Sequence, residues 1–523
     1  MSLAASPLRA AAAHLDGVKL TAALATIVCA APALAVMVLA LTGGAPIELG
    51  ATLIRDGAMG TLALMLVGGG GAIVLGAASA WLVSLCDFPG RRVFEWLLVI
   101  PLAAPSYILA YAYAGMTWAG AAPVAVEGFW GAAFVYAVGL YPYVYLAGRA
   151  AFASQSACAL EAARTLGVRP SLVFWRVALP LARPGIVAGA ALALMEIAAD
   201  YGAAQHFGLT TLSTAIFRAW YAHQSLAAAL QVAAILLAAA LVFLIVERSA
   251  RGRAAFGGGS SRWRPLPRYR LAALPATLAT TFCTVLVLLG AALPLAWLAR
   301  LAWLNANIGD VAQPTINSLL LATFGAALTL ALAAAVASAA RRSGAIGKVS
   351  LFAAGMGYAA PGAVIAMGAL ALFALAREAG WIGGLGSGLA LLALIWTYAA
   401  RFAAAGVGPI DAGLARLSKG IDASARTLGA GPWRRLVAID LPIALPSLAT
   451  AALILFVEIL KELPATLILR PFNFDTLAVQ AYSYASDERL LQAAAPALLI
   501  FLAGLAPIVL IARGIDRTRA GAR

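Results

Sequence analysis

Long apolar runs, separated by short polar or basic intervals, follow one another along the whole chain. Each run is roughly 20 residues long, the length that an α-helix needs to cross the hydrocarbon of a bilayer. The pattern predicts an all-α protein with about twelve transmembrane helices. The expected spans cover residues 20–41, 59–85, 93–115, 129–148, 184–205, 226–246, 271–298, 316–340, 349–376, 387–409, 446–463 and 490–512.

Composition supports this interpretation. With 63% apolar and 11% charged residues, the chain has more apolar surface than a soluble core can hide, so we expect a polytopic membrane protein. The first run is too long for the apolar region of a signal peptide, about 7 to 15 residues, and is predicted to be a retained span. The four cysteines show no CxxC spacing and are predicted to be packing residues.

The charge pattern predicts the orientation. Most of the 36 Lys and Arg residues fall in alternate intervals, beginning with the N-terminal one. Because Lys and Arg are retained on the cytoplasmic side, both termini are expected to be cytoplasmic. The net charge of +15 fits this bias, and no basic domain with interleaved aromatic residues is present, so no nucleic-acid partner is expected.

An internal repeat divides the chain. The segment Ala163–Gly167 recurs 262 positions later as Ala425–Gly429, and Leu179-Pro180 matches Leu441-Pro442 in the same register. A repeat at half the chain length indicates duplication. We therefore expect two pseudo-symmetric halves of six spans, residues 1–246 and 271–523, each with one such loop, near 158–183 and 420–446. Residues 247–270 carry seven Arg and a Gly-Ser run, and are predicted to be a flexible cytoplasmic linker.

Each loop is predicted to form a short helix that a glycine ends. Glu161 places a carboxylate at the start of a stretch of good helix formers, and Gly167 can adopt the left-handed conformation that terminates a helix. In the second copy Ala423 stands at the position of Glu161, and the nearest acid is Asp422. A compact helix and turn of this kind can dock in a pocket of a partner protein. The alternative interpretation is a loop with only a structural role.

The motif Glu161-Ala162-Ala163, with Gly167 and the downstream Leu179-Pro180, resembles the EAA loop in permeases of bacterial ABC importers. The resemblance implies a type I importer permease fold in the bacterial inner membrane. It also implies two copies of a cytoplasmic ATPase, which bind ATP and Mg, and a periplasmic substrate-binding protein. The residues implied to couple to the ATPase are Glu161, Ala162, Ala163, Gly167, Asp422, Ala425 and Gly429.

Acidic residues follow each loop in the same register, with Glu196 matching Glu458 and Asp200 matching Glu462. Carboxylates within a membrane are costly and normally face a water-filled path or a partner. If each helix continues through both acids, the members of a pair share a face. A passage or gate and a locking ion-pair network that includes Lys461 both remain open. The candidate passage residues are Glu196, Asp200, Tyr201, Glu458, Lys461 and Glu462.

The segments 461–466, 469–472 and 475–478, together with 199–202, resemble fused ferric-iron permeases. The resemblance implies ferric iron as substrate, with thiamine, polyamine, sulfate and phosphonate as alternatives within the same importer class. Ferric ion prefers carboxylate and phenolate oxygens, but transport needs weak sites, so an acid-lined passage is expected rather than a tightly bound metal.

The motifs expected of an enzyme are missing from the sequence. The nearest approach to a phosphate-binding loop, Gly344–Val349, has the wrong glycine spacing and no hydroxyl after Lys348. With three His and no HExxH motif, a membrane hydrolase is a weak alternative. We therefore expect a transport subunit without a cofactor of its own. An ion-coupled secondary transporter also has repeats and buried acids, but it needs no paired docking loops.

Overall fold

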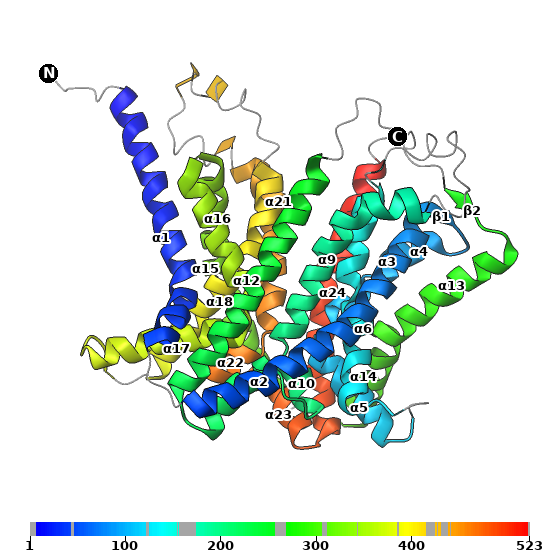
Figure 1. Cartoon of the computed structure of the whole chain (residues 1–523). Helices are drawn as coiled ribbons and strands as arrows, with labels where there is room; N and C mark the ends of the chain where they lie inside the picture. Colours follow the sequence, from blue (N-terminus) through cyan, green and yellow to red (C-terminus); the bar gives the residue numbers. More distant parts are fainter. Residues whose placement is uncertain are drawn as a thin grey trace. The chain divides into compact units, whose positions relative to one another are not determined.

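The computed structural model is almost entirely helical (Figure 1). The described part of the chain falls into two compact units, one of residues 1–44 and 313–476 and the other of residues 45–312 and 477–523. The structure describes all residues except 1–6, 43–46, 122–124, 154, 156–173, 257–267, 306–310, 343, 384–385, 415–423, 426, 430–437, 440 and 521–523.

The first unit is a bundle of long helices and one short helix. Its elements are α1 (Pro7–Thr42), α15 (Ala312–Arg342), α16 (Gly344–Ala359), α17 (Gly362–Glu378), α18 (Ser387–Leu414), α21 (Leu441–Leu460) and α22 (Pro464–Leu469).

The second unit adds one pair of two-residue parallel strands to its helices. Its elements are α2 (Ile47–Leu64), η1 (Met65–Gly69), α3 (Gly70–Leu85), β1 (Cys86–Asp87), α4 (Arg91–Leu97), η2 (Ile100–Ala103), α5 (Ser106–Trp118), α6 (Gly128–Ala153), η3 (Phe174–Ala178), α9 (Leu179–Ala199), α10 (Gly202–His206), α11 (Leu212–Phe217), η4 (Arg218–Ala222), α12 (Leu226–Phe256), β2 (Tyr269–Arg270), α13 (Ala273–Val287), η5 (Leu288–Ala292), α14 (Leu293–Leu304), α23 (Leu477–Ser486) and α24 (Leu490–Ala520).

The helices found agree with the expected spans. The described residues contain ten helices that are long and apolar enough to cross a membrane, or up to twelve if each of two bent helix pairs forms one span. The bends were not expected. The predicted span 93–115 is broken by 91° before α5, and the predicted span 349–376 is broken by 110° before α17. Each break lies at an Ala-Pro step, at Pro105 and Pro361, because proline lacks an N–H donor and disfavours helix at the preceding residue.

The compact units exchange helices between the two halves of the sequence. The helix α1, from the first half, packs on α16, α17 and α18 of the second half. Within this contact the hydroxyls of Thr26 and Ser350 lie 2.8 Å apart, and the indole N–H of Trp396 donates to the carbonyl of Val28 at 3.0 Å. In the second unit, α14 from the second half packs on α5 from the first. The halves predicted from the repeat are therefore units of sequence and not the compact units. The first half contributes α1 to the first unit, and the second half contributes α13, α14, α23 and α24 to the second unit.

The start of the predicted linker is helical. The helix α12 continues to Phe256, ten residues beyond the predicted end of the sixth span, because residues 247–256 are rich in good helix formers such as Glu, Arg and Ala. Residues 257–267 of the linker lie outside the described part. Residues 269–270 form β2, which pairs with β1.

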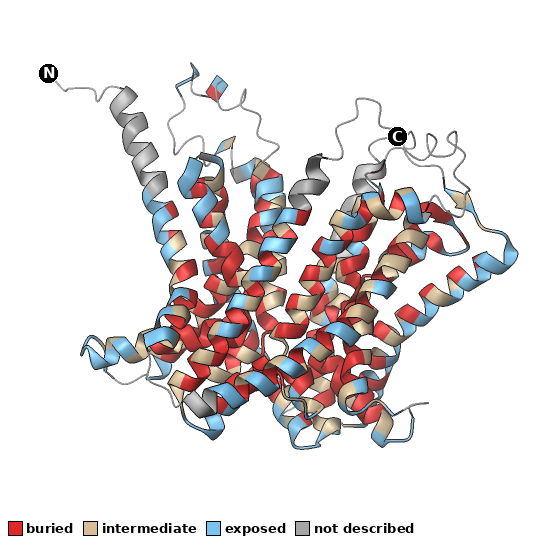
Figure 2. Ribbon diagram, viewed as in Figure 1, coloured by how far each residue is buried: buried red, intermediate tan, exposed pale blue. Residues whose placement is uncertain are grey.

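Burial distinguishes the interior of the helix bundles from their exposed surface (Figure 2). Tyr136, Tyr141 and Tyr145 of α6 are completely buried in the second unit. The helix α1 instead carries large apolar side chains that are more than half exposed, and their spacing of three, four or seven residues places them along one helical face. This face suits a bilayer. The exposed residues are Leu20, Leu24, Ile27, Leu34 and Val38.

Candidate functional site

The second predicted docking loop is described at its end. The N–H of Leu428 donates to the carbonyl of Ser424 at 3.0 Å, and Gly429 follows with φ +74°. The predicted left-handed glycine is therefore confirmed here. Ala425 is buried under the turn, whereas the side chain of Leu428 is 84% exposed. The coupling role stays a prediction, and five of its residues lie outside the described part of the chain: Glu161, Ala162, Ala163, Gly167 and Asp422.

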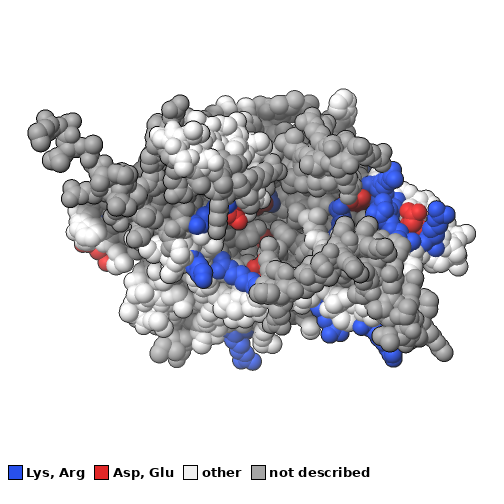
Figure 3. Space-filling view, turned by 90° about the horizontal axis from the view of Figure 1, so that it is seen from above, with Lys and Arg blue, Asp and Glu red and all other residues white. Residues whose placement is uncertain are grey.

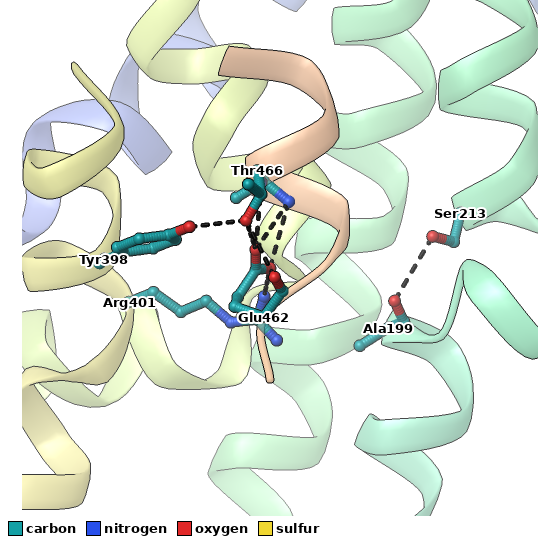
Figure 4. Close-up of polar contacts among 7 residues, drawn as sticks. Ala199, Ser213, Tyr398, Arg401, Glu462 and Thr466 are labelled. Carbon is teal, nitrogen blue, oxygen red and sulfur yellow. Dashed lines mark hydrogen bonds and ion pairs between the residues drawn. The ribbon is translucent and has the colours of Figure 1, made fainter. Parts of the chain in front are cut away.

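Glu462 is the centre of a buried polar network in the first unit (Figure 4). Its carboxylate accepts the backbone N–H groups of Ala465 and Thr466, each at 3.1 Å, and forms an ion pair with Arg401 of α18. Thr466 in turn lies 2.6 Å from the hydroxyl of Tyr398. Only 5% of Glu462 is exposed, so the carboxylate charge is both paired and hydrogen-bonded, as a buried charge needs to be.

The local sequence explains why the acid lies there. The helix α21 ends at Leu460, and α22 begins at Pro464, a residue that suits the first turn of a helix. The first N–H groups of a helix lack partners within it, and a carboxylate before the helix satisfies them. Glu462 therefore caps α22.

A glycine makes room for the ion pair. A β-carbon on Gly362, the first residue of α17, would lie 1.9 Å from Nη1 of Arg401 and 2.2 Å from Oε1 of Glu462. A β-carbon does not approach other atoms this closely, so a side chain at residue 362 would displace the ends of Arg401 and Glu462. The glycine at the start of α17 therefore leaves the ion pair its present position.

Glu458 has a different partner. Its carboxylate lies 2.8 Å from the ammonium of Lys461, and both side chains are partly exposed. Lys461 was predicted as a partner for one of the two acids, and this pairing is found. Sequence reasoning missed Arg401, Tyr398, Thr466 and Gly362. The signal for Arg401 was available, because it is a cation inside the predicted span 387–409.

The matching acid of the first half performs the same cap. Asp200 follows the last residue of α9, and its Oδ1 accepts the N–H of Ala203 at 2.8 Å at the start of α10. The hydroxyl of Tyr143 donates to Glu196 at 3.4 Å. Nearby, the Ser213 hydroxyl donates to the carbonyl of Ala199, also at 3.4 Å (Figure 4).

Tyr201 is held by aromatic neighbours in the second unit. Its hydroxyl lies 2.8 Å from that of Tyr482, and its ring stacks on Phe217 with centroids 3.6 Å apart. The phenol oxygen is thus placed next to a second phenol oxygen.

One expectation about the acids is wrong. Asp200 and Glu462 do not continue the helices that carry Glu196 and Glu458, because α9 ends at Ala199 and α21 at Leu460. The predicted spans to residues 205 and 463 are too long for the same reason. Asp200 has extended backbone angles, φ −70° and ψ 124°, since its side chain serves the next helix. The members of each pair therefore do not share a helical face.

The two halves differ in charge at the positions that supply the ion-pair partners of the acids. In the register of the repeat, Arg401 and Lys461 match Gly139 and Ala199, so the first half has no cation at either position. The acids of the second half each have an ion-pair partner. Throughout the described part of the chain, no three or more His, Cys, Asp or Glu side chains are grouped in a way that could hold a metal ion.

Comparison with known proteins gives the same duplication. A family described as binding-protein-dependent transport system inner membrane component matches residues 72–255 and again residues 327–520. Over 463 residues the chain is 25% identical to the Fe(3+)-transport system permease protein FbpB 2 of Haemophilus influenzae, a match that covers 86% of this chain and 88% of that protein.

Shorter matches relate parts of the chain to other permeases. The molybdenum transport system permease protein ModB of Escherichia coli is 30% identical over 145 residues, 25% of this chain and 62% of ModB. The sulfate transport system permease protein CysT of Synechococcus elongatus is 34% identical over 116 residues, 20% of this chain and 42% of CysT. With its apolar spans and its two matched segments, the chain belongs to the family of binding-protein-dependent transport system inner membrane components and is a fused, two-domain permease of that family.

Proposed function

We propose that this permease passes ferric iron from a periplasmic binding protein to the cytoplasm, driven by two copies of a separate cytoplasmic ATPase that bind ATP and Mg. The observation that carries the proposal is the match to a ferric-iron permease over nearly the full length of both chains. The molybdenum and sulfate permeases match over shorter parts, from 20% to 38% of this chain. The permease itself supplies the passage and no cofactor.

The oxygen atoms of the first-half acids support a cationic substrate. In the second half, Glu458 and Glu462 form ion pairs with Lys461 and Arg401. Carboxylate oxygens of Glu196 and Asp200, with phenol oxygens nearby, are the atoms that ferric ion prefers and that an oxyanion avoids. The passage role is therefore assigned to the first-half acids, and the second-half acids stabilise the fold.

Neutralising the first-half acids tests the passage role. The double variant Glu196→Gln, Asp200→Asn keeps side-chain volume, and Asn retains an oxygen that can cap α10. We expect ATP-driven uptake of ferric iron into proteoliposomes to fall more than about tenfold, because a membrane-buried carboxylate that faces the substrate cannot be replaced by a neutral amide. Protein abundance and ATPase binding should not change.

The matched control removes a balanced pair. Glu458→Gln with Lys461→Met deletes one acid and one cation that neutralise each other, so uptake should stay close to that of the unchanged protein. Normal uptake in the first-half variant would reject the passage role. Transport of molybdate or sulfate, in preference to ferric iron, would reject the assigned substrate.

We further propose that both termini and the linker are cytoplasmic, as the distribution of Lys and Arg favours. A protease added to the cytoplasmic face should cut within residues 257–270, and cuts within residues 470–475 should need access from the periplasmic face. Phe472 in the latter segment is 93% exposed. The fragments should stay together after linker cleavage, because α1 and α14 pack against helices of the other half. Cleavage with the opposite sidedness would reverse the topology.

A further inference from the structure

A pocket rich in arginine lies beside the paired strands β1 and β2 in the second unit. Its volume is about 540 Å³, and four of the eight described residues that line it are arginines, with a single acid among them. Figure 3 shows basic side chains gathered at the edge where Figure 1 places these strands. The pocket is lined by Asp87, Phe88, Gly90, Arg91, Arg92, Val93, Arg268 and Arg270.

The short strand pair builds this pocket from segments distant in sequence. Cys86 pairs with Tyr269 and Asp87 with Arg270, which brings the chain after α3 beside the chain before α13. Arg268 directly precedes β2, and Arg270 is its last residue. Both residues are exposed and line the pocket.

Arg91 supplies a buried donor without an acceptor. Only 7% of this residue is exposed, and its Nη1 donates to the carbonyl of Val83 at 3.2 Å. Its Nε is buried and makes no hydrogen bond, since the nearest oxygen of Asp87 is 3.8 Å away. Glu95 lies at the same distance from Nη1 and is also bonded to Arg149. The two carboxylates compensate the charge of Arg91, whereas Arg92, Arg268 and Arg270 are exposed and give the mouth of the pocket a positive charge that an anion can neutralise.

We propose that this arginine pocket binds the phosphate group of an anionic phospholipid. Guanidinium groups match phosphate oxygens in charge and in the geometry of their donors. The pocket lies where a headgroup lies, because the span that includes α3 ends at Leu85 and the span that includes α13 begins at Ala273. Basic pockets next to span ends are typical sites for anionic lipid headgroups.

An apolar surface for acyl chains adjoins the pocket. Val93 lines the pocket and is 58% exposed, and α4 packs on α13. On α13, Leu274 and Leu278 are 70% and 61% exposed and lie one turn apart on one face. A phosphate dissolved in water gains nothing from these side chains, whereas a lipid covers them. The lipid is therefore favoured over a free anion.

Thermal unfolding of the full-length permease in a neutral detergent tests the proposal. Short-chain phosphatidylglycerol should raise the melting temperature, and phosphatidylcholine with the same chains should not. In the double variant Arg268→Gln, Arg270→Gln, the apparent affinity for phosphatidylglycerol should fall about 25-fold, because each basic residue near an anionic lipid contributes about fivefold. The control Arg55→Gln, Arg218→Gln removes two exposed arginines outside the pocket and should respond like the unchanged protein.

Three results would overturn the proposal. An unchanged response to phosphatidylglycerol in the double variant would place the lipid elsewhere. An equal stabilisation by inorganic phosphate at the same concentration would identify the ligand as a free anion. Loss of ATPase binding in the double variant, with the lipid response intact, would identify the pocket as a surface for a protein partner.

Discussion

Replacing Arg401 by Met is expected to lower the free energy of unfolding by about 3 to 5 kcal/mol, the usual cost of leaving one member of a buried ion pair without its partner. Glu462 is almost completely buried, and its remaining hydrogen bonds from Ala465 and Thr466 do not neutralise its charge. Denaturant or thermal unfolding in detergent measures the loss. Gly362→Ala should also destabilise the protein, but by less, since the ends of the Arg401 and Glu462 side chains can move away from the added carbon.

Two further variants make this test specific. Lys461→Met removes a cation from a partly exposed pair and should cost no more than about 1 kcal/mol. Adding Glu462→Gln to Arg401→Met removes the buried charge but keeps an oxygen for the cap of α22, so part of the stability should return. Equal losses for Arg401→Met and Lys461→Met would show that the Arg401–Glu462 pair does not stabilise the fold.

Replacing Gly429 by Val is expected to abolish uptake while the permease remains inserted and folded. At φ +74° a β-branched residue is strained, and no atom of the described residues lies within 4 Å of the added β-carbon, so the expected effect comes from the backbone conformation. The turn that presents Leu428 should then change shape and the ATPase should dissociate. Co-purification of the ATPase and ATP-driven uptake, measured on the same preparation, report both effects.

Asn is the matched control at this position. It adopts the left-handed conformation far more readily than Val, so Gly429→Asn should retain most of the uptake. If Gly429→Val binds the ATPase and transports normally, the loop is not a docking element. The same pair of substitutions at Gly167 tests the first loop, and Glu161→Ala should be milder because Ala423 already occupies the equivalent place.

Hydrophobic periodicity and the repeat were enough to predict the number of spans, the duplication and the left-handed Gly429. Each of these depends on residues close in sequence. The two bends, before α5 and before α17, could not be predicted in this way. Pro142 and Pro184 lie inside continuous helices, whereas Pro105 and Pro361 each follow a break. Neighbouring helices decide whether the backbone groups freed by a proline find partners, and the sequence of one span does not contain that information.

The candidate site shows the same division. The matching positions of the four acids could be read from the repeat, and a residue three places from Glu458 could be predicted as its partner. The Arg401–Glu462 pair joins residues 61 positions apart. The sequence around each residue does not indicate that the other is its partner. The exchange of helices could not be predicted from the sequence either, because a repeat shows which segments are alike and does not show which segments are in contact.

The exchange of the first span also affects how the protein is made. The contact between Thr26 and Ser350 joins residues 324 positions apart. At about 5 to 20 residues per second, the ribosome needs roughly 15 to 65 s after α1 has emerged before its partner helix exists. During that interval the side of α1 that later packs on protein must rest against lipid. Its residues Ala22, Ala25, Cys29 and Ala33 are small and apolar, so α1 can remain in the bilayer as a stable single helix until the second half of the chain arrives.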